Sequence, residues 1–493
     1  MLDSVKYFAI CLLLCVAAAF VTAPVASGDW PEYTTTAFAI ASHATPDIRL
    51  SDVRAAEAAF PDGKVYYEQI AAKIDAPQGV PELGFHRARN GQLFAWHFFS
   101  YPALVAAPLV ALEVSRVPPS KAFVLANWAF VLVLALSLRR LFKSASQAGL
   151  GTLLFVLTGG IGYCAWTSPE WACAAALLSA LALYLSDAPI LAGLLTAFAA
   201  SQNPSMAAFI GFAPLLRFIV RWQRTVPLFE QVKRDIDWRH AVGLAVAAGG
   251  AVAPYLFNWW AWGVPSLIAS RSTSMELIGA DRLLSFLFDP NQGLIIGFPA
   301  IVIGLLAIVR ARRDVLLAVA AFLFTLVLAL PTLTTQNWNS AAAGVMRYAF
   351  WSGMPLLFVL LFVLVPRWRA SWALAALVVI GQVVATYTAT TYNYLQMSPL
   401  AKLVLAKAPQ AYNPDPEIFV ERTLHRDLMK HIAADEVVVF STEDGISRKA
   451  LVHEKHAASD APLCGPGQHL NGYTVSDAGG GWRYLNGPFQ CSH

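Results

Sequence analysis

Two carboxylates, Asp29 and Glu32, lie in the stretch ASGDWPEYTTT (26–36), directly after the first long apolar run of the chain. A carboxylate at a membrane boundary can meet a lipid-borne substrate whose reactive group lies at headgroup level. In its ionised form it can accept a proton from an attacking hydroxyl group or help to hold a divalent cation. The stretch therefore predicts acid–base chemistry or a cation site, with Asp29 and Glu32 as the ligands if a metal is bound.

The same spacing also has a purely structural interpretation. Asp-x-x-Glu with a proline between is typical of a helix start, where Asp29 would cap the first turn and Glu32 would bond back to it in a capping box. The two interpretations are compatible, because a helix N-terminus stabilises an ionised carboxylate. The local pattern favours the cap, and only the position in the whole chain favours chemistry.

The composition indicates a membrane protein. Of 493 residues, 57% are hydrophobic and 13% are charged, whereas a soluble domain usually carries about 25% charged residues. The net charge of +4 is modest, and no basic block with interleaved aromatics points to nucleic acid as a partner. The expected partner of most of the surface is the lipid bilayer.

We predict an all-α polytopic membrane protein. A spanning helix needs about 20 predominantly apolar residues. Eleven stretches are interpreted as spans: 5–26, 120–140, 148–166, 169–187, 189–202, 204–220, 240–262, 293–310, 314–333, 348–366 and 372–395. The fifth, 189–202, is short enough to be half of a re-entrant pair.

The basic residues favour one orientation of these spans. Cytoplasmic loops are enriched in Lys and Arg, and an N-terminus in the cytoplasm puts most of them there: Arg139, Arg140, Lys143, Arg217, Arg221, Arg224, Lys233, Arg234, Arg239, Arg310, Arg312, Arg313, Arg367 and Arg369. Residues 1–395 would then form the membrane domain. The loop 27–119 and a C-terminal domain, 396–493, would lie outside the cytoplasm. A signal peptide cleaved near Ala26 is the alternative for the first span.

The first outside loop combines polar and apolar segments. Tyr67, Ile70, Ala71 and Ile74 follow a helical repeat, which predicts a helix lying along the membrane interface. The stretch 98–112 is apolar but short and broken by proline, so we expect it to pack flat or to dip into the outer leaflet.

The C-terminal region predicts a small α+β domain. Asp415 is expected to cap a helix with Pro416 at its first position, and EVVVFST indicates a strand. Cys464 and Cys491 are expected to form a disulfide in an oxidising compartment, with two free thiols as the alternative. The sole N-x-Ser sequence, at Asn203, is blocked by proline. This favours the plasma membrane of a bacterium, with the C-terminal domain in the periplasm.

Several stretches together resemble a known family. GDWPEY after the first span resembles the G-D-x-P-x-Y motif of many bacterial members of the GT-C superfamily, polytopic glycosyltransferases that use polyprenyl-phosphate sugars. Three later stretches resemble further family segments in matching order, so that the likeness covers most of residues 20–366: GQLFAWHFFSYPALVAAP, FDPNQGLIIGFPAI and NWNSAAAGVMRYAFWSGMPLL. The chain departs from the family at Trp30, where a second acid is common, and at Ala103, where a second proline is usual. His97 stands at the usual basic position.

The resemblance implies an inverting transfer of a sugar from a polyprenyl-phosphate donor to a glycan, lipid or protein acceptor. Asp29 would be the catalytic base, and a divalent cation is an optional cofactor. The resemblance also implies donor phosphate-binding and supporting residues, each of which has a structural alternative: His86, Arg87, Arg89, His97 and Arg347 for the phosphate, and Glu32, Tyr33 and Tyr101 for support.

Two other functions remain open from the sequence. One is a transporter or flippase of lipid-linked sugars, although the acids lie at one surface and not near the bilayer midplane. The other is a polymerase or ligase that uses diphosphate-linked glycans.

Two further acids have structural interpretations. Glu170 is interpreted as a first-turn helix acid, and Asp289, before Pro290, as part of a turn or helix start.

Overall fold

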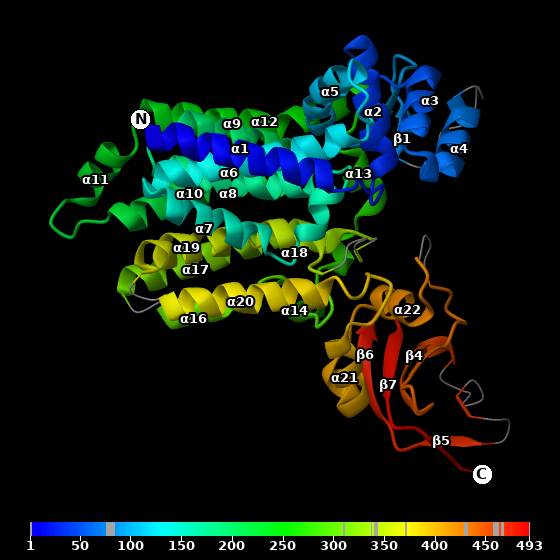
Figure 1. Ribbon diagram of the computed structural model, residues 1–493. Helices are drawn as coiled ribbons and strands as arrows, with labels where there is room; N and C mark the ends of the chain where they lie inside the picture. The colour runs from blue at the N-terminus through cyan, green and yellow to red at the C-terminus, as the bar shows by residue number, and fades with distance from the viewer. Residues whose placement is uncertain are drawn as a thin grey trace.

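The computed structural model describes residues 2–74, 84–308, 311–336, 338–339, 344–369, 372–427, 432–456, 463–464 and 468–492. It is mostly helical, with a bundle of roughly aligned helices and two smaller groups of elements beyond one end of the bundle (Figure 1). One group belongs to the predicted first loop and the other to the predicted C-terminal domain.

The expectation of a membrane protein is supported by seven helical stretches. Among the described residues, these seven are long and apolar enough to cross a membrane. They coincide with seven of the eleven predicted spans: α1 (Leu2–Val21), α6 (Lys121–Phe142), η3 with α10 (Pro204–Ala208 and Phe209–Arg221), α12 (Trp238–Trp262), α17 with η5 (Arg312–Ala329 and Leu330–Thr334), α18 with α19 and η6 (Arg347–Ser352, Met354–Leu364 and Val365–Arg367) and α20 (Trp372–Ala389).

The other four predicted spans form helices too short for this criterion, so the count of eleven is not confirmed. They are α7 (Ala145–Val156), α8 (Glu170–Leu185), α9 (Pro189–Gln202) and α16 (Pro299–Ile308). Every residue of α8 is buried, and α8 packs against α6, α9 and α19. A helix that is apolar all round is expected at such a position, surrounded by protein and not by lipid. The short connecting helices are η2 (Ile161–Ala165), α11 (Leu228–Asp235), α13 (Leu267–Ser272), η4 (Met275–Leu277), α14 (Ala280–Phe288) and α15 (Leu294–Gly297).

The predicted first loop folds into a compact group at one end of the bundle. Its elements are α2 (Trp30–His43), α3 (Leu50–Ala59), η1 (Pro61–Gly63), α4 (Lys64–Ile74), the antiparallel pair β1 (Phe85–Arg87) and β2 (Leu93–Ala95), and α5 (Ser100–Glu113). The expected helix is present as α4, but Tyr67, Ile70 and Ala71 are buried in a core that includes Trp30. This apolar stripe packs on protein and does not face lipid. The position of α4 relative to the bilayer stays a prediction.

The C-terminal region forms the predicted α+β unit. Its helices are α21 (Pro399–Lys407), η7 (Pro409–Ala411), α22 (Pro416–Leu424) and η8 (Glu454–His456). Its strands form an antiparallel sheet in the order β3-β4-β7-β6 and a separate pair, β5 with β8: β3 (Val438–Ser441), β4 (Ser447–His453), β5 (His469–Asn471), β6 (Thr474–Gly479), β7 (Trp482–Asn486) and β8 (Gln490–Ser492). Asp415 caps α22 by accepting a hydrogen bond from the Glu417 amide. Cys464 and Cys491 form the expected disulfide.

Two ion pairs attach the C-terminal unit to the helical bundle. Asp289, directly after α14, pairs with Arg422 of α22 at 3.0 Å, and the side chains of both residues are at most 1% exposed. Arg282 of α14 pairs with Asp415 at 2.9 Å. Asp289 also accepts the amide of Asn291, so the expected turn is present. No local pattern predicted its partner Arg422, which lies 133 residues away.

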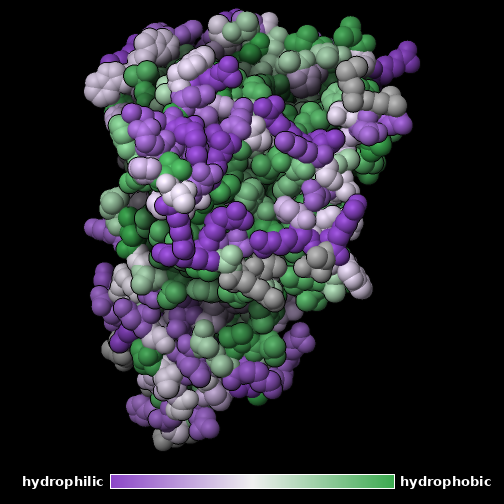
Figure 2. Space-filling model, turned by 90° about the vertical axis from the view of Figure 1, so that its left-hand side faces the viewer, coloured by the Kyte–Doolittle hydropathy of each residue, from purple (hydrophilic) through white to green (hydrophobic). Residues whose placement is uncertain are grey.

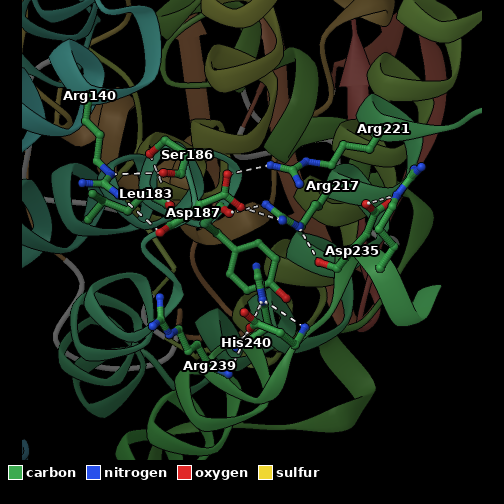
Figure 3. Close-up of polar contacts among 12 residues, drawn as sticks. Arg140, Leu183, Ser186, Asp187, Arg217, Arg221, Asp235, Arg239 and His240 are labelled. Atoms are coloured by element: carbon green, nitrogen blue, oxygen red, sulfur yellow. Dashed lines mark hydrogen bonds and ion pairs between the residues drawn. The ribbon is translucent and has the colours of Figure 1, made fainter. Parts of the chain in front are cut away.

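The opposite end of the bundle carries the N-terminus and α11 (Figure 1). Figure 2 faces this end and shows hydrophilic side chains gathered across it, with hydrophobic ones between them. A network of polar contacts ties the helix ends together here (Figure 3). Arg217 donates to Asp187 at 2.7 Å and to the Asp235 carbonyl at 2.8 Å, and Arg221 donates to the second oxygen of Asp187 at 2.7 Å. Arg140 donates to the carbonyl of Ser186 at 3.1 Å.

We expect Asp187→Asn to destabilise this end of the bundle. Asp187 has φ +59°, a left-handed conformation that asparagine also tolerates, so the substitution removes the charge with little backbone strain. Arg217 is only 2% exposed and would lose its charged acceptor. The free energy of unfolding should fall by about 1–2 kcal/mol. A lower melting temperature in detergent would report this loss of stability. The control is Asp281→Asn, at the exposed start of α14. Equal melting of both variants would contradict the structural role of Asp187.

Candidate active site

The motif GDWPEY forms a turn that leads into α2. Gly28 has φ +67°, and a Cβ atom at this position would lie 3.1 Å from the Trp166 ring, so both the backbone and the close contact favour glycine. The turn places Asp29 at the N-cap of α2 and Glu32 at its third position. The sequence thus predicted the start of the helix correctly.

The predicted capping box is wrong. The Asp29 side chain makes no capping hydrogen bond, and the Glu32 side chain does not bond back to it. Instead, Asp29 accepts a hydrogen bond from Nη1 of Arg347 at 2.9 Å, and Glu32 lies 2.5 Å from Nδ1 of His97. Charge-assisted bonds of this kind are stronger than a bond to a neutral amide, which explains why the carboxylates turn away from the helix end.

Five ionisable side chains meet at this place, and we call them the Asp29 cluster: Asp29, Glu32, His97, Glu170 and Arg347. His97 Nε2 lies 3.7 Å from Asp29 Oδ2, and Arg347 Nη1 lies 4.0 Å from Glu170 Oε1. The Asp29 side chain is 31% exposed, whereas that of Glu32 is 6% exposed. Of these two carboxylates, Asp29 is therefore the one that an external molecule can reach, and Glu32 is buried beneath the surface.

Four separate parts of the chain supply these side chains. α2 carries Asp29 and Glu32, the segment between β2 and α5 carries His97, and Glu170 and Arg347 are the first residues of α8 and α18. The buried helix α8 contacts α18, which brings the two helix starts together. The site therefore depends on the packing of the first loop against the bundle.

The charges in the cluster shift one another's protonation. Burial alone would raise the pKa of Asp29, but Arg347 and His97 hold it below its ordinary value. Burial raises the pKa of Glu32, and His97 offsets only part of this rise. Burial alone would lower the pKa of His97, yet the charges of Glu32 and Asp29 raise it. At neutral pH we therefore expect an ionised Asp29 beside a protonated His97.

The raised pKa of His97 predicts a pH dependence of stability. Protonated His97 adds stability that is fully present below its ordinary pKa of 6.5 and is lost as pH rises through the raised pKa. We expect the melting temperature of the wild type to fall from neutral to alkaline pH, and to fall less in His97→Gln. Melting curves of both proteins at several pH values test this. Parallel pH profiles would show that His97 is not charged in the folded protein.

The two predicted supporting tyrosines differ in their surroundings. The Tyr33 ring lies 5.1 Å from the ring of His97, centroid to centroid, and 5.9 Å from that of Tyr101. Tyr101 is fully buried, and its hydroxyl donates to Asn127 at 3.0 Å. Tyr33 therefore packs directly on the cluster, whereas Tyr101 packs on Tyr33.

Within the described part of the chain, no ion pair joins the other three predicted phosphate-binding residues to the Asp29 cluster. His86 is buried near Arg271, and burial together with this charge lowers its pKa to about 4, so it is neutral at pH 7. Arg87 donates to the carbonyls of Gly91 and Ile74. The Arg89 side chain lies close against Gly263. Arg347 and His97 are the two predicted cations that the structure brings to Asp29.

The sequence did not reveal the role of Glu170. Glu170 lies in the first turn of α8, as predicted, but it is also only 6% exposed and faces Arg347. Arg347 also donates to the Tyr348 hydroxyl at 3.0 Å, which fixes its guanidinium from a second side. The available signal was that Glu170 begins a predicted span at the same end as Asp29. Closeness between two such helix starts cannot be read from one sequence.

Within the described ranges, no group of three or more His, Cys, Asp or Glu side chains is arranged to hold a metal ion. Asp29 and Glu32, the candidate ligands, are each bonded to a basic side chain.

No family model, curated protein or solved structure matches the chain. The class that the fold defines is therefore a helical membrane protein with a charged site at one end of its bundle.

Proposed function

We propose that this protein is a membrane glycosyltransferase of the GT-C type that uses a polyprenyl-phosphate sugar as donor. One observation carries the proposal: the accessible carboxylate of Asp29 is released from helix capping and lies between two cations, Arg347 and His97, at one end of the bundle. A base next to phosphate-binding cations is the arrangement that displacement of a phosphate from a sugar requires. The resemblance of GDWPEY to the family motif supports the same function.

In the proposed reaction, Asp29 accepts the proton of a hydroxyl group on the acceptor. The oxygen of this hydroxyl group attacks the anomeric carbon of the donor at the same time. The bond between this carbon and the phosphate oxygen breaks, and polyprenyl phosphate leaves with the electron pair. Single displacement inverts the anomeric configuration. Arg347 and His97 offset the negative charge of the leaving phosphate, the arginine by its planar fork of donors.

Donor binding would also activate Asp29. In the structure, Arg347 and His97 hold the pKa of Asp29 down, which makes it a weak base. A phosphate that takes over bonds from these cations would remove this effect, and the pKa of Asp29 would rise towards a useful range. The ion pair between Asp29 and Arg347 thus occupies the phosphate position until the donor arrives.

The arrangement of the bundle supports the proposed orientation. The Asp29 cluster and the C-terminal unit lie at one end, and the N-terminus and α11 lie at the other (Figure 1). The second end carries the exposed basic residues Arg140, Arg234 and Arg239. By the positive-inside rule, that end faces the cytoplasm and the site faces the periplasm of a bacterial plasma membrane.

Purified protein in proteoliposomes tests the proposal. A panel of polyprenyl-phosphate pentoses and hexoses is added with an extract of envelope glycans, and released polyprenyl phosphate is measured by mass spectrometry. We expect one donor to be consumed only when an acceptor is present. Movement of intact donor across the bilayer without release of phosphate would instead identify a flippase. Consumption of diphosphate-linked glycans alone would identify a polymerase or ligase.

A further inference from the structure

A second polar site lies at the junction of the C-terminal unit and the bundle. A cavity of about 1090 Å³ is lined by residues of the segment after α20, of α21 and α22, and of the hairpin of β3 and β4. None of its lining residues belongs to the Asp29 cluster. Two lysines and two arginines line it: Lys402, Lys407, Arg422 and Arg448.

Arg422 is the most informative of these residues. Its side chain is fully buried, and Nη1 donates to Asp289 and to the Tyr412 hydroxyl. Within the described part of the chain, Nε and Nη2 of Arg422 are buried without a hydrogen-bond partner. A buried guanidinium with two unused donors is costly, because desolvation of these groups is not repaid by bonds. The cost disappears if a ligand in the cavity accepts both bonds.

Two neighbouring groups have the same property. The residues Thr423 and Arg448 line the same cavity, and Thr423 Oγ1 and Arg448 Nε are also buried without a partner among the described residues. Asp289 balances the charge of Arg422. The remaining charges on the wall are Lys402, Lys407 and Arg448, together with Glu443 and Asp444 at the exposed turn of the β3–β4 hairpin. The residues around the cavity therefore combine unused donors with three further basic side chains and two carboxylates.

We propose that this cavity binds the phosphate group of a ligand, with Arg422, Thr423 and Arg448 as donors. Arginine holds phosphate through paired bonds, and a hydroxyl can add a further donor. Apolar side chains also line the cavity, including Met397, Leu403 and Phe440, so that it suits an amphiphilic ligand. The phosphate can come from a bilayer lipid or from a water-soluble molecule. This site does not depend on the proposed transferase activity.

Calorimetry on the full-length protein in phosphatidylcholine nanodiscs tests the proposal, with inorganic phosphate as the probe. Arg448→Gln and Thr423→Val each remove one unused donor but keep Arg422 and its bond to Asp289. We expect one saturable phosphate site per chain, weakened about tenfold in each variant. Arg483→Gln is the matched control, because Arg483 also has a buried Nε without a partner among the described residues but does not line the cavity.

A second measurement distinguishes the two sources of phosphate. Native mass spectrometry after mild delipidation from phosphatidylglycerol nanodiscs should show a retained phospholipid on wild type and Arg483→Gln, and its loss from Arg448→Gln, if the ligand is a lipid. Binding of inorganic phosphate without retained lipid would indicate a soluble ligand. The proposal is overturned if wild type shows neither, or if Arg448→Gln and Thr423→Val bind phosphate and lipid as wild type does.

Discussion

Asp29→Asn is expected to reduce sugar transfer by about 10²–10⁴-fold, the usual contribution of a positioned general base. Asparagine matches the shape of aspartate and is equally suitable at the start of a helix. The substitution therefore removes the proton acceptor without an obvious cause of misfolding. Release of polyprenyl phosphate in proteoliposomes, at matched protein amounts, measures the effect.

A suitable control for this prediction is Asp62→Asn. Asp62 belongs to the same group of elements as Asp29, but it is exposed in η1 and forms none of the contacts of the cluster. We expect it to transfer sugar at the wild-type rate. If Asp29→Asn also transferred sugar normally, Asp29 would only mark the start of α2, and the base would have to be sought elsewhere.

Arg347→Gln is expected to weaken both stability and donor binding. Arg347 is bonded to Asp29 at 2.9 Å and lies 4.0 Å from Glu170, so its loss leaves two neighbouring carboxylates without their shared cation. Leaving such groups unsatisfied costs about 1–3 kcal/mol of unfolding free energy. Loss of a charged bond to the donor phosphate should raise KM by about tenfold or more. Thermal melting and donor titrations measure the two effects separately.

Two further variants separate the structural effect of Arg347 from the functional one. The double variant Asp29→Asn with Arg347→Gln removes one carboxylate together with its partner, so it should melt closer to wild type than Arg347→Gln does. It should still be inactive. Arg347→Lys keeps the charge but loses the planar fork, and we expect intermediate binding. A double variant that regains transfer would contradict the role of Asp29 as the base.

The start of α2 shows what a single sequence can predict. Gly28, Asp29 and Pro31 encode the turn and the helix start locally, and the structure has both. Whether Asp29 caps the helix is not a local question, because the competing partner Arg347 lies 318 residues away. The same applies to Glu32, which bonds to His97 in place of the N-cap. Local sequence predicted the helix start, and long-range pairing decided the orientation of the Asp29 and Glu32 side chains.

The helices show a similar limit. Apolar length predicted the seven long helices well, each of which is long and apolar enough to cross a membrane. The same apolarity in α8 (Glu170–Leu185) reflects burial inside the protein, which composition does not separate from contact with lipid. Local signals also predicted the C-terminal unit, with its capped helix and its disulfide. Its attachment through Asp289 and Arg422 had no such signal.

The most direct test of the proposed function uses a deletion strain of the source organism, complemented with wild type or Asp29→Asn at matched membrane expression. Mass spectrometry of polyprenyl-phosphate sugars and surface glycans is the measurement. The proposal predicts that the variant strain accumulates one lipid-linked sugar and lacks that sugar in one glycan, lipid or protein, which would name donor and acceptor together. Identical donor pools and glycans in both strains would contradict a catalytic role of Asp29.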